Sequence, residues 1–382
     1  MYNSTPIKGT GRAVSWVCGS LFTIFSVLYL YFMQSDLLAT AQHLLSQGKT
    51  SYSPLWGTAV ITLVLLLPPG MFHRLFHFPA RFRALSYFPS CLLLGMLTSG
   101  VPGGGWEVRW AIDWWLAGAA LLLYLALIWV VLHFPDVKKG GPNFFSYLWP
   151  NLGILFLSFA VAGSVAETTD VYHYRLKAER MISMGRDAEA LEVGRKSLDA
   201  DRSLTAMRAF ALDRMGKLGE RLFEYPQYSG SEGLVPERSD TAYAHGWANL
   251  LYRHLGGKPG KVKSVTQFLE RLSGLPSATS SVADYLLCAY LLDKNLDAFA
   301  AALPKYYAID ENLPLHYKEA VVLYDRLHTA PSVLYRDAAV ETNLNDFVRH
   351  GAQYRHPVER ANQCRRMYGH TYWWYYYYQP LE

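Results

Sequence analysis

Four acidic residues are the first candidates for chemistry: Asp36, Glu107, Asp113 and Glu167 each lie near the end of a long apolar stretch. If these ends gather on one side of a membrane, paired carboxylates there could act as a general acid and a general base. Short loops beside a membrane also contain acidic residues for solubility alone, and we prefer that interpretation. No catalytic residue is therefore predicted, and a pocket lined by Asp36, Glu107, Asp113 and His43 would be needed to favour an enzyme.

Metal and phosphate chemistry find little support. His73 and His77 stand four residues apart, which would place both on one helix face, but they lie in a basic segment without a third ligand. The stretch from Gly256 to Lys261 is one residue too short for a phosphate-binding loop, and Val262 replaces the required Ser or Thr. The sequence predicts neither a metal site nor a cofactor.

The four cysteines divide between two environments. Cys18 and Cys91 lie in apolar runs and are expected to pack as small apolar residues. Cys288 and Cys364 lie in the polar part of the chain, which we place outside the cytoplasm, where a disulfide can persist. Cys288 follows Leu286 and Leu287 in a helical pattern, so a buried thiol is favoured, and a disulfide stays an alternative.

The segment 368–378 is an aromatic tail, because eight of its eleven residues are Tyr or Trp. It is predicted to fold back over the last helices, and two alternatives stay open. Tyr and Trp also lie at membrane interfaces, and they anchor protein interfaces. For the last alternative the candidate partner-binding residues are Tyr372, Trp373, Trp374 and Tyr375.

The candidate residues above are distributed over two modules. The boundary between the modules is predicted at Ala166/Glu167, where the composition changes. The first 166 residues contain nine Lys or Arg and four Asp or Glu, and the last 216 contain 27 of each class. The whole net charge of +5 therefore belongs to the first module, so the basic pI does not indicate a nucleic-acid partner. The lipid bilayer is the expected partner of this module. Five apolar runs predict membrane spans at about 13–33, 54–72, 84–101, 114–134 and 144–166.

The five predicted spans contain no charged residue, but they differ in how many helix-breaking residues they contain. The third contains Pro89, Gly95 and Gly100 and is the weakest, and Pro68-Pro69 should kink or end the second. The first run is longer than a signal peptide's apolar region, so it is interpreted as a retained anchor. Because no Asp, Glu, Lys or Arg lies inside a span, a transporter or channel subunit is a weaker alternative.

Loop charges predict the orientation. With five spans, one side holds seven basic residues and the other holds only Lys49 and Arg109. Cytoplasmic loops are rich in Lys and Arg, so the N-terminus is predicted to be cytoplasmic and the C-terminal module extracytoplasmic. In a bacterium with two membranes this module would be periplasmic, anchored in the inner membrane. Omitting the third span would reverse that placement.

Residues 167–350 predict a stack of helical hairpins, followed by a C-terminal segment at 351–382. Turns are expected near Gly185, Gly216, Gly256, Lys294 and His328, at separations of 31, 40, 38 and 34 residues. The stretch from Gly185 to Leu191, with Ser197-Leu198 and Asp201, resembles the second helix of a tetratricopeptide (TPR) repeat, although Asp201 stands where the repeat usually has Pro. In that pattern Leu191 and Leu198 should fill the seam between helices.

The whole layout also resembles an uncharacterised family of bacterial multi-pass membrane proteins with C-terminal TPR-like repeats. The residues that suggest it are Gly216–Phe223, Tyr225-Pro226-Gln227 and Tyr372–Tyr375. The resemblance implies an all-α architecture, with a five-helix transmembrane bundle followed by an α-solenoid. Stacked hairpins form a concave groove, so the expected function is a membrane-anchored scaffold or binding module for a protein partner in the cell envelope. The alternatives are an envelope enzyme and a transporter or channel subunit.

Overall fold

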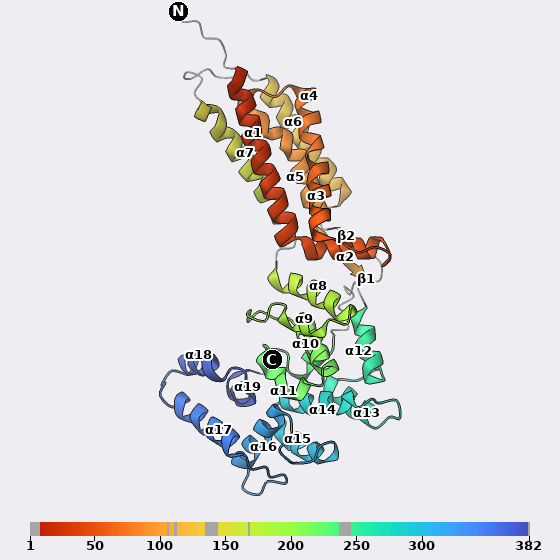
Figure 1. The fold of residues 1–382 in the computed structure, drawn as a ribbon, viewed down its shortest axis with the longest axis vertical. Coiled ribbons are helices and arrows are strands. Elements are labelled where there is room, and N and C mark those ends of the chain that lie inside the picture. Colours follow the sequence, from red (N-terminus) through yellow and green to blue (C-terminus); the bar gives the residue numbers. More distant parts are fainter. Residues whose placement is uncertain are drawn as a thin grey trace, which may run out of the picture. The chain divides into compact units, whose positions relative to one another are not determined.

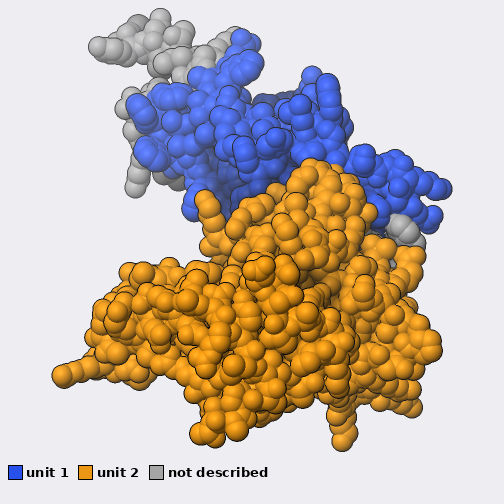
Figure 2. Space-filling model, turned by 60° about the horizontal axis from the view of Figure 1, so that its bottom comes forward, with its two compact units in different colours: residues 1–173 blue, residues 174–382 orange. Residues whose placement is uncertain are grey.

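The chain folds into two compact helical units. The computed structural model describes residues 8–104, 107–110, 113–133, 144–166, 169–236 and 246–380. Unit 1 comprises residues 1–173 and unit 2 comprises residues 174–382 (Figure 2). The boundary lies inside helix α8 (Asp170–Ser183), a few residues after the change in composition at Ala166/Glu167. The expectation of a helical protein is confirmed, with one short β-hairpin as the exception.

Unit 1 contains long apolar helices and short connecting elements (Figure 1). Its elements are α1 (Lys8–Leu28), the π-helical turn η1 (Tyr29–Met33), α2 (Ser35–Leu45), α3 (Pro54–Leu65), α4 (Leu67–Phe76), the 3₁₀ helix η2 (Ala80–Tyr87), α5 (Phe88–Leu97), β1 (Gly100–Gly104), β2 (Glu107–Trp110), α6 (Trp114–His133) and α7 (Phe144–Val165). In the described part of the chain, four helical segments are long and apolar enough to cross a membrane: Gly11–Met33, Pro54–Phe76, Trp115–His133 and Phe144–Val165.

The second of these segments is broken where its prolines predict a kink. Helix α3 ends at Leu65, and α4 begins at Leu67 with both prolines in its first turn, where a missing N–H costs nothing. Pro69 cannot donate to the carbonyl of Leu65, which lies four residues earlier. Ser90 Oγ of α5 donates to that carbonyl instead, at 2.6 Å. The hydrogen bond at the break therefore links α5 to α3 and α4.

The third expected span, 84–101, is not one continuous helix. Its first residues belong to η2 and its middle to α5, which has only ten residues, so five spanning helices are not established. Hydrogen bonds nevertheless join this region to the start of α1 and to η1 at its other end. Arg83 Nη1 donates to the carbonyl of Gly11 near the start of α1, and Tyr29 and Thr98 share a hydrogen bond of 3.1 Å at its other end.

Asn151 of α7 holds the irregular η2 backbone in place. Its Oδ1 accepts from the N–H of Ala84 at 2.7 Å, and its Nδ2 donates to the carbonyls of Ala80 and Tyr147 at 2.9 and 2.7 Å. The side chain is fully buried. One amide thus binds two backbone groups of the irregular η2 segment.

The strands β1 and β2 pair antiparallel, with Gly100 opposite Trp110 and a bulge between Pro102 and Gly104. Both strands contact α2, which follows the end of η1. The buried apolar side chains of α2 include Leu37, Leu38 and Leu44. The hairpin and α2 thus form a short layer at one end of unit 1.

Unit 2 is built from short helices (Figure 1). After α8 its elements are α9 (Asp187–Glu192), α10 (Arg202–Arg214), α11 (Leu218–Arg221), η3 (Leu222–Glu224), η4 (Gly230–Leu234), α12 (Trp247–Leu255), α13 (Val265–Ser273), α14 (Ser281–Leu292), α15 (Leu296–Ala302), η5 (Leu303–Lys305), α16 (Leu315–Leu327), α17 (Ala338–Gly351), α18 (Pro357–Tyr368) and α19 (Tyr372–Tyr378). Some of these helices pack against their neighbours in the chain, whereas α11 packs against α14 and α16, and α19 returns to α16. Nearly all of α10 and α14 is buried, so these two helices form the centre of the unit.

The five expected turns all fall between consecutive helices. Gly185, Gly216, Gly256 and Lys294 have φ values of +73°, +66°, +85° and +56°, the left-handed conformation that commonly ends a helix. His328 follows the last residue of α16 in an extended conformation. The positions of the turns are therefore confirmed.

The first hairpin departs from the expected packing. Leu191 is buried, but α9 ends at Glu192 and Leu198 is 56% exposed, so the prediction that Leu198 fills the seam is wrong. The chain turns at Gly194 (φ +60°), where a Cβ atom would meet the ring of Tyr174 at 2.6 Å. Asp201 then caps α10 by accepting from the N–H of Leu204 at 2.7 Å. This cap explains why Asp stands where the repeat usually has Pro.

Candidate functional site

The aromatic tail forms a helix that is packed into unit 2. Thr371 caps α19 by accepting from the N–H of Trp374 at 3.3 Å. The four candidate partner-binding residues, Tyr372, Trp373, Trp374 and Tyr375, are all at most 8% exposed. Binding of a partner by these side chains therefore requires α19 to leave its place, whereas the predicted fold-back over other helices agrees with the structure.

A buried histidine–glutamate pair holds the start of α19. Glu319 Oε2 accepts from the N–H of Tyr372 at 2.8 Å and contacts His316 Nδ1 at 2.9 Å. His316 Nε2 faces the N–H of Phe223 at 3.3 Å, so Nε2 is the acceptor and Nδ1 carries the proton that it donates to Glu319. Both side chains are at most 3% exposed. This pair, the His316–Glu319 pin, joins α16, η3 and α19.

Further contacts connect the tail to the centre of the unit. Tyr375 donates its hydroxyl proton to the carbonyl of Leu292 at 2.7 Å, and Lys294 Nζ donates to the carbonyl of Gln379 at 2.6 Å. The ring of Phe223 lies 5.2 Å from that of Tyr372 and 5.0 Å from that of Tyr375. The segments 223–227 and 372–375, which stood apart in the sequence, therefore meet in the fold.

These two segments enclose a cavity of about 160 Å³, which we call the tail pocket. One wall comes from η3 and the stretch after it, together with Leu198, and the other comes from α18, α19 and the residues beside them. The lining residues are Leu198, Phe223, Glu224, Tyr225, Pro226 and Gln227 on the first side and Arg365, Gly369, His370, Trp374, Tyr375 and Gln379 on the second. Aromatic rings and polar side chains thus share one small space.

Three polar groups of the tail pocket have unused hydrogen-bonding capacity. Gln227 is 4% exposed, and its Nε2 donates to the carbonyl of Leu222 at 3.0 Å, which fixes its Oε1 as an acceptor without a partner. The hydroxyl of Tyr225, which is 3% exposed, also lacks a partner. The Arg365 guanidinium stacks 4.9 Å from the ring of Trp374, and no carboxylate in the described part of the chain pairs with it.

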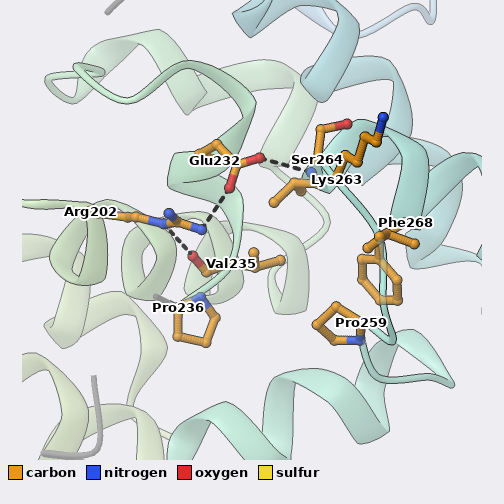
Figure 3. Close-up of a pocket in the computed structure, with 10 residues that line it drawn as sticks. Arg202, Glu232, Val235, Pro236, Pro259, Lys263, Ser264 and Phe268 are labelled. Carbon is orange, nitrogen blue, oxygen red and sulfur yellow. Dashed lines mark hydrogen bonds and ion pairs between the residues drawn. The ribbon is translucent and has the colours of Figure 1, made fainter. Parts of the chain in front are cut away.

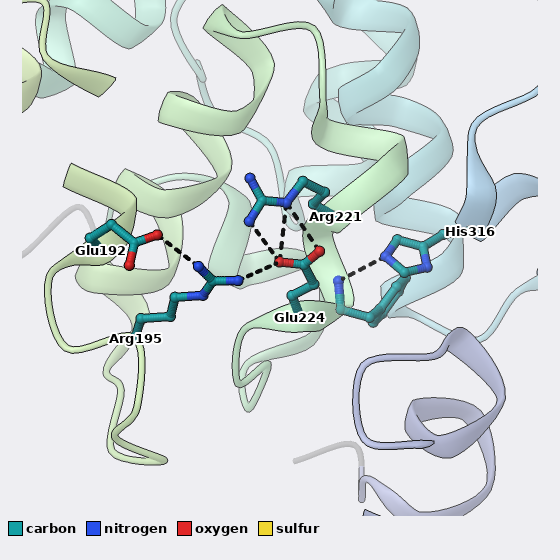
Figure 4. Close-up of polar contacts among 6 residues, drawn as sticks. Glu192, Arg195, Arg221, Glu224 and His316 are labelled. Atoms are coloured by element: carbon teal, nitrogen blue, oxygen red, sulfur yellow. Dashed lines mark hydrogen bonds and ion pairs between the residues drawn. The ribbon is translucent and has the colours of Figure 1, made fainter. Parts of the chain in front are cut away.

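Charges beside the pocket are already paired (Figure 4). Glu224 accepts from Arg221 at 2.8 Å and lies 3.7 Å from Arg195, which also pairs with Glu192 at 2.7 Å. Burial alone would raise the pKa of Glu224, but the hydrogen bond and charge of Arg221, together with Arg195, outweigh it and hold that pKa below its usual value. Glu224 is thus a satisfied carboxylate, and Arg365 is the cation with free donors.

A Ser–His–Asp group in unit 2 fails as a nucleophilic triad. His254 Nε2 contacts both Asp213 Oδ2, at 2.6 Å, and Ser281 Oγ, at 2.9 Å. A triad needs the acid on one ring nitrogen and the nucleophile on the other. Burial raises the pKa of Asp213, opposed by hydrogen bonds from Ser281 and His254. The group joins α10, α12 and α14 and does not activate the serine.

A second cavity, of about 340 Å³, lies beside the start of α13 (Figure 3). Its arginine is engaged: Arg202 donates to Glu232 at 2.9 Å and to the carbonyl of Val235 at 3.3 Å. Glu232 in turn accepts from the N–H of Val265 at 2.9 Å. Pro236, Pro259 and Phe268 supply apolar walls. Arg202 and Glu232 thus satisfy one another, and Lys263 is the other charged residue of the lining.

The other sequence candidates lie in unit 1. Asp36 and His43 stand in the first and last turns of α2, Asp113 precedes α6 and accepts from Trp115 Nε1 at 3.2 Å, and Glu107 begins β2. Glu167 lies outside the described residues. The tail pocket, the cavity beside α13 described above and a further cavity between α16 and α17 are lined by residues of unit 2 and by none of these candidates.

The histidine and cysteine candidates are not brought together. His73 lies in the last turn of α4 and His77 follows it in a left-handed conformation. In the described residues no group of three or more His, Cys, Asp or Glu is arranged to hold a metal. Cys288 and Cys364 are buried free thiols, each beside a tyrosine hydroxyl, so the disulfide alternative is wrong.

Sequence reasoning missed Arg365 and the His316–Glu319 pin. The spacing of His316 and Glu319, three residues apart on one helix face, was a usable signal. Arg365 gave none, because its role depends on a ring nine residues further along the chain.

Together these features define a helical protein with apolar helices long enough to span a membrane and a second helical unit that closes on its own C-terminal tail. Residues 265–379 match a family of unknown function, DUF6057. The match runs from α13 to the end of α19 and so includes the tail and its side of the tail pocket. It supports the expectation of an uncharacterised family. Neither the curated proteins nor the solved structures include a significant match to the chain.

Proposed function

We propose that this chain is a membrane-anchored binding module that holds a protein partner through the tail pocket. The observation that carries the proposal is the pocket itself, with its aromatic walls and the Arg365 guanidinium, which no carboxylate of the described residues pairs. Its volume of about 160 Å³ is below the roughly 300–1,000 Å³ typical of small-molecule sites, but suits a single side chain. Protein interfaces concentrate their binding energy in such buried anchors.

The anchor in this proposal crosses the membrane five times, with the segment 83–98 as the third crossing. The contacts of Arg83 with Gly11 and of Thr98 with Tyr29 support this, because they place the ends of the segment at opposite ends of α1. Eighteen residues of helix separate Gly11 from Tyr29, which is about 27 Å, close to the ~30 Å of bilayer hydrocarbon. Irregular backbone is tolerated at that depth only when protein covers it, as Asn151 covers η2.

With five crossings, the loop charges place the N-terminus in the cytoplasm and unit 2 outside it. In a bacterial inner membrane, unit 2 would then face the periplasm. Tethering beside the membrane raises the local concentration of envelope partners. A C-terminal alkaline phosphatase fusion tests the orientation, since it is active only after export. Activity of a C-terminal fluorescent fusion that matures only in the cytoplasm would contradict five crossings.

Unit 2 in this proposal is a TPR-like stack closed by its tail. The support is the series of consecutive helices with a turn where the repeat spacing expects one, of which α10/α11, α14/α15 and α16/α17 pack against each other. The second helices α9, α11 and α15 are shorter than their partners, at six, four and seven residues. The stack is therefore a modified form of the repeat.

Site-specific crosslinking in cells tests the function. A photoreactive benzoylphenylalanine replaces His370, which lines the tail pocket and is exposed. The matched control carries the same group at Asp297, an exposed residue that does not line the pocket. We expect a crosslinked protein band from position 370 that position 297 does not give. Equal labelling of the same proteins from both positions, or no labelling from either, would contradict a specific partner at this pocket.

A further inference from the structure

The end of unit 1 at which α1 begins and α4 ends is basic, and its described residues include no carboxylate. We propose that this end binds an anionic phospholipid, with Arg12 and Arg74 on the head group and the acyl chains along the exposed apolar faces of α1 and α4. The inference goes beyond the protein partner of unit 2. It rests on the proposed function only in requiring that unit 1 is inserted in a membrane.

Arg83 of η2 brings the ends of the two helices together. The 3₁₀ helix η2 packs against both α1 and α4. Arg83 Nη1 donates to the carbonyl of Gly11 in α1, and the Arg83 charge is close enough to act on His73 in the last turn of α4. Arg12 follows Gly11 and Arg74 follows His73. The two exposed arginines therefore lie beside the same central arginine.

The positive charge at this end is not balanced within the described part of unit 1. Arg83 donates to neutral oxygens, the Gly11 carbonyl and Ser15 Oγ, the latter at 2.6 Å. In the described residues up to 166, the acidic side chains lie at the opposite end of the unit, in α2, in β2 and just before α6 (Figure 1); they are Asp36, Glu107 and Asp113. Like charges held together repel one another. An anion between the arginines would relieve that repulsion.

Each exposed arginine continues an exposed apolar helix face. Trp16, one turn after Arg12, is 77% exposed. Met71 and Leu67, one and two turns before Arg74, are also exposed. Both arginines lie within three residues of the end of a helical segment long enough to span a membrane. A phospholipid has the same two parts in the same order, with a charged head group at the membrane surface and apolar chains below it.

The arginines favour a head group with a net negative charge. Arg12 and Arg74 are exposed, and neither has a hydrogen-bond or ion-pair partner in the described residues. A guanidinium binds a phosphate through two parallel hydrogen bonds. Phosphatidylcholine also has a phosphate, but its choline cation cancels that charge and is repelled by the neighbouring arginines. A free phosphate lacks the chains that would cover the apolar faces.

Native mass spectrometry of the full chain in a neutral detergent tests the proposal. The protein is given an equal mixture of phosphatidylglycerol and phosphatidylcholine with identical acyl chains, and the two adducts are compared. A basic residue beside an anionic membrane surface contributes a preference of roughly fivefold, so two arginines should favour phosphatidylglycerol by up to roughly 25-fold. An excess of sn-glycerol 3-phosphate, which lacks acyl chains, should not displace the lipid.

Variants assign the preference to the two arginines. Arg12→Gln and Arg74→Gln should each reduce it roughly fivefold, and the double variant should remove it. Arg74→Lys keeps the charge and should retain most of the preference. Arg109→Gln is the matched control, because it removes an exposed arginine from β2 at the end that also holds the acidic side chains. This control should keep the preference of the natural chain.

Several outcomes would overturn the proposal. Two are equal binding of both lipids by the natural chain and a preference that survives in the double variant. An equal loss in Arg109→Gln would assign the preference to net charge alone, and displacement by sn-glycerol 3-phosphate would assign it to a soluble phosphate. The crosslink from position 370 is independent of these results. Its presence together with equal lipid binding would refute this inference alone and leave the proposed function standing.

Discussion

Replacing Glu319 should release the aromatic tail, because one carboxylate oxygen satisfies two buried donors. Glu319→Leu leaves the N–H of Tyr372 and the Nδ1–H of His316 without an acceptor in a site that is at most 3% exposed. Each unsatisfied buried donor costs about 1–3 kcal/mol, so a loss of about 3 kcal/mol in the free energy of unfolding is a moderate expectation. Unit 2 spans residues 174–382. For a domain of that size, 1 kcal/mol corresponds to roughly 2–4 °C in Tm, so Tm should fall by roughly 6–12 °C.

The assay is intrinsic fluorescence during heating of the full chain in detergent, with limited trypsin digestion alongside it. Trp373 and Trp374 of α19 are two of the eleven tryptophans, so the fluorescence gives Tm of the whole chain and the digestion reports on the tail. Arg365 and Arg366 of α18 are the expected cleavage sites once the tail opens. Glu319→Gln keeps one oxygen acceptor and should lose less than the leucine variant. Glu311→Gln, at an exposed glutamate, is the control.

The reasoning would be refuted if Glu319→Leu melted within about 1 °C of the natural chain. It would also be refuted if trypsin cleaved both proteins equally slowly at residues 365–366. Either result would mean that the His316–Glu319 pin does not hold α19, and that the ring contacts around Phe223 suffice.

Three further predictions concern other parts of the chain. Asn151→Leu should destabilise unit 1 by about 2–4 kcal/mol, because it leaves the N–H of Ala84 and the carbonyl of Ala80 unpaired, and a lower aggregation temperature in detergent would show it. Asp337 caps α17 through the N–H groups of Val340 and Ala339, which lower its pKa, so the stabilisation is present above about pH 4 and is lost as the pH falls through the folded-state pKa. Asp337→Ala should lose about 1 kcal/mol at neutral pH, and Asp337→Asn should show a flatter acid dependence in a pH series of melting curves. Cys288 and Cys364 should resist maleimide in the folded chain and react after denaturation, which intact-mass measurement detects; a mass two hydrogens lower than the reduced form would indicate a disulfide instead.

The turns of unit 2 were predictable because a local rule sets them. A helix that must reverse direction ends in a left-handed residue, and glycine adopts that conformation without steric cost. Gly185, Gly216 and Gly256 follow this rule. Lys294 follows it at a non-glycine residue, and its ammonium group also binds the carbonyl of Gln379.

The early end of α9 was not predictable from the repeat pattern. The small and apolar spacing favoured a helix that continues to Leu198, but the chain turns at Gly194 against the ring of Tyr174. Arg208 then donates to the carbonyls of Val193 and Gly194, each at 3.1 Å, from a buried position on α10. A contact from another helix thus satisfies the backbone where the pattern expected further helical hydrogen bonds.

The arrangement of the third expected span, 84–101, was hard to predict from the sequence for a similar reason. A hydropathy argument counts residues in one continuous helix, and Pro89 and the glycines reduce that count. The structure replaces continuity with side-chain hydrogen bonds, from Asn151 to η2 and from Ser90 to the carbonyl of Leu65. Such bonds depend on which residues of different helices face each other. The spacing of residues along the sequence does not determine these neighbours.

The two segments that form the tail pocket could be recognised in the sequence, but their contact in the fold could not. Both segments that form it were recognisable, since Tyr225-Pro226-Gln227 and Tyr372–Tyr375 are unusual in composition. Their meeting depends on Glu319, which binds the N–H of Tyr372 while His316 binds the N–H of Phe223. One buried pair on α16 therefore sets the distance between the two walls. A ligand in the pocket would contact both walls, so its binding should stabilise the same closed tail that the pin maintains.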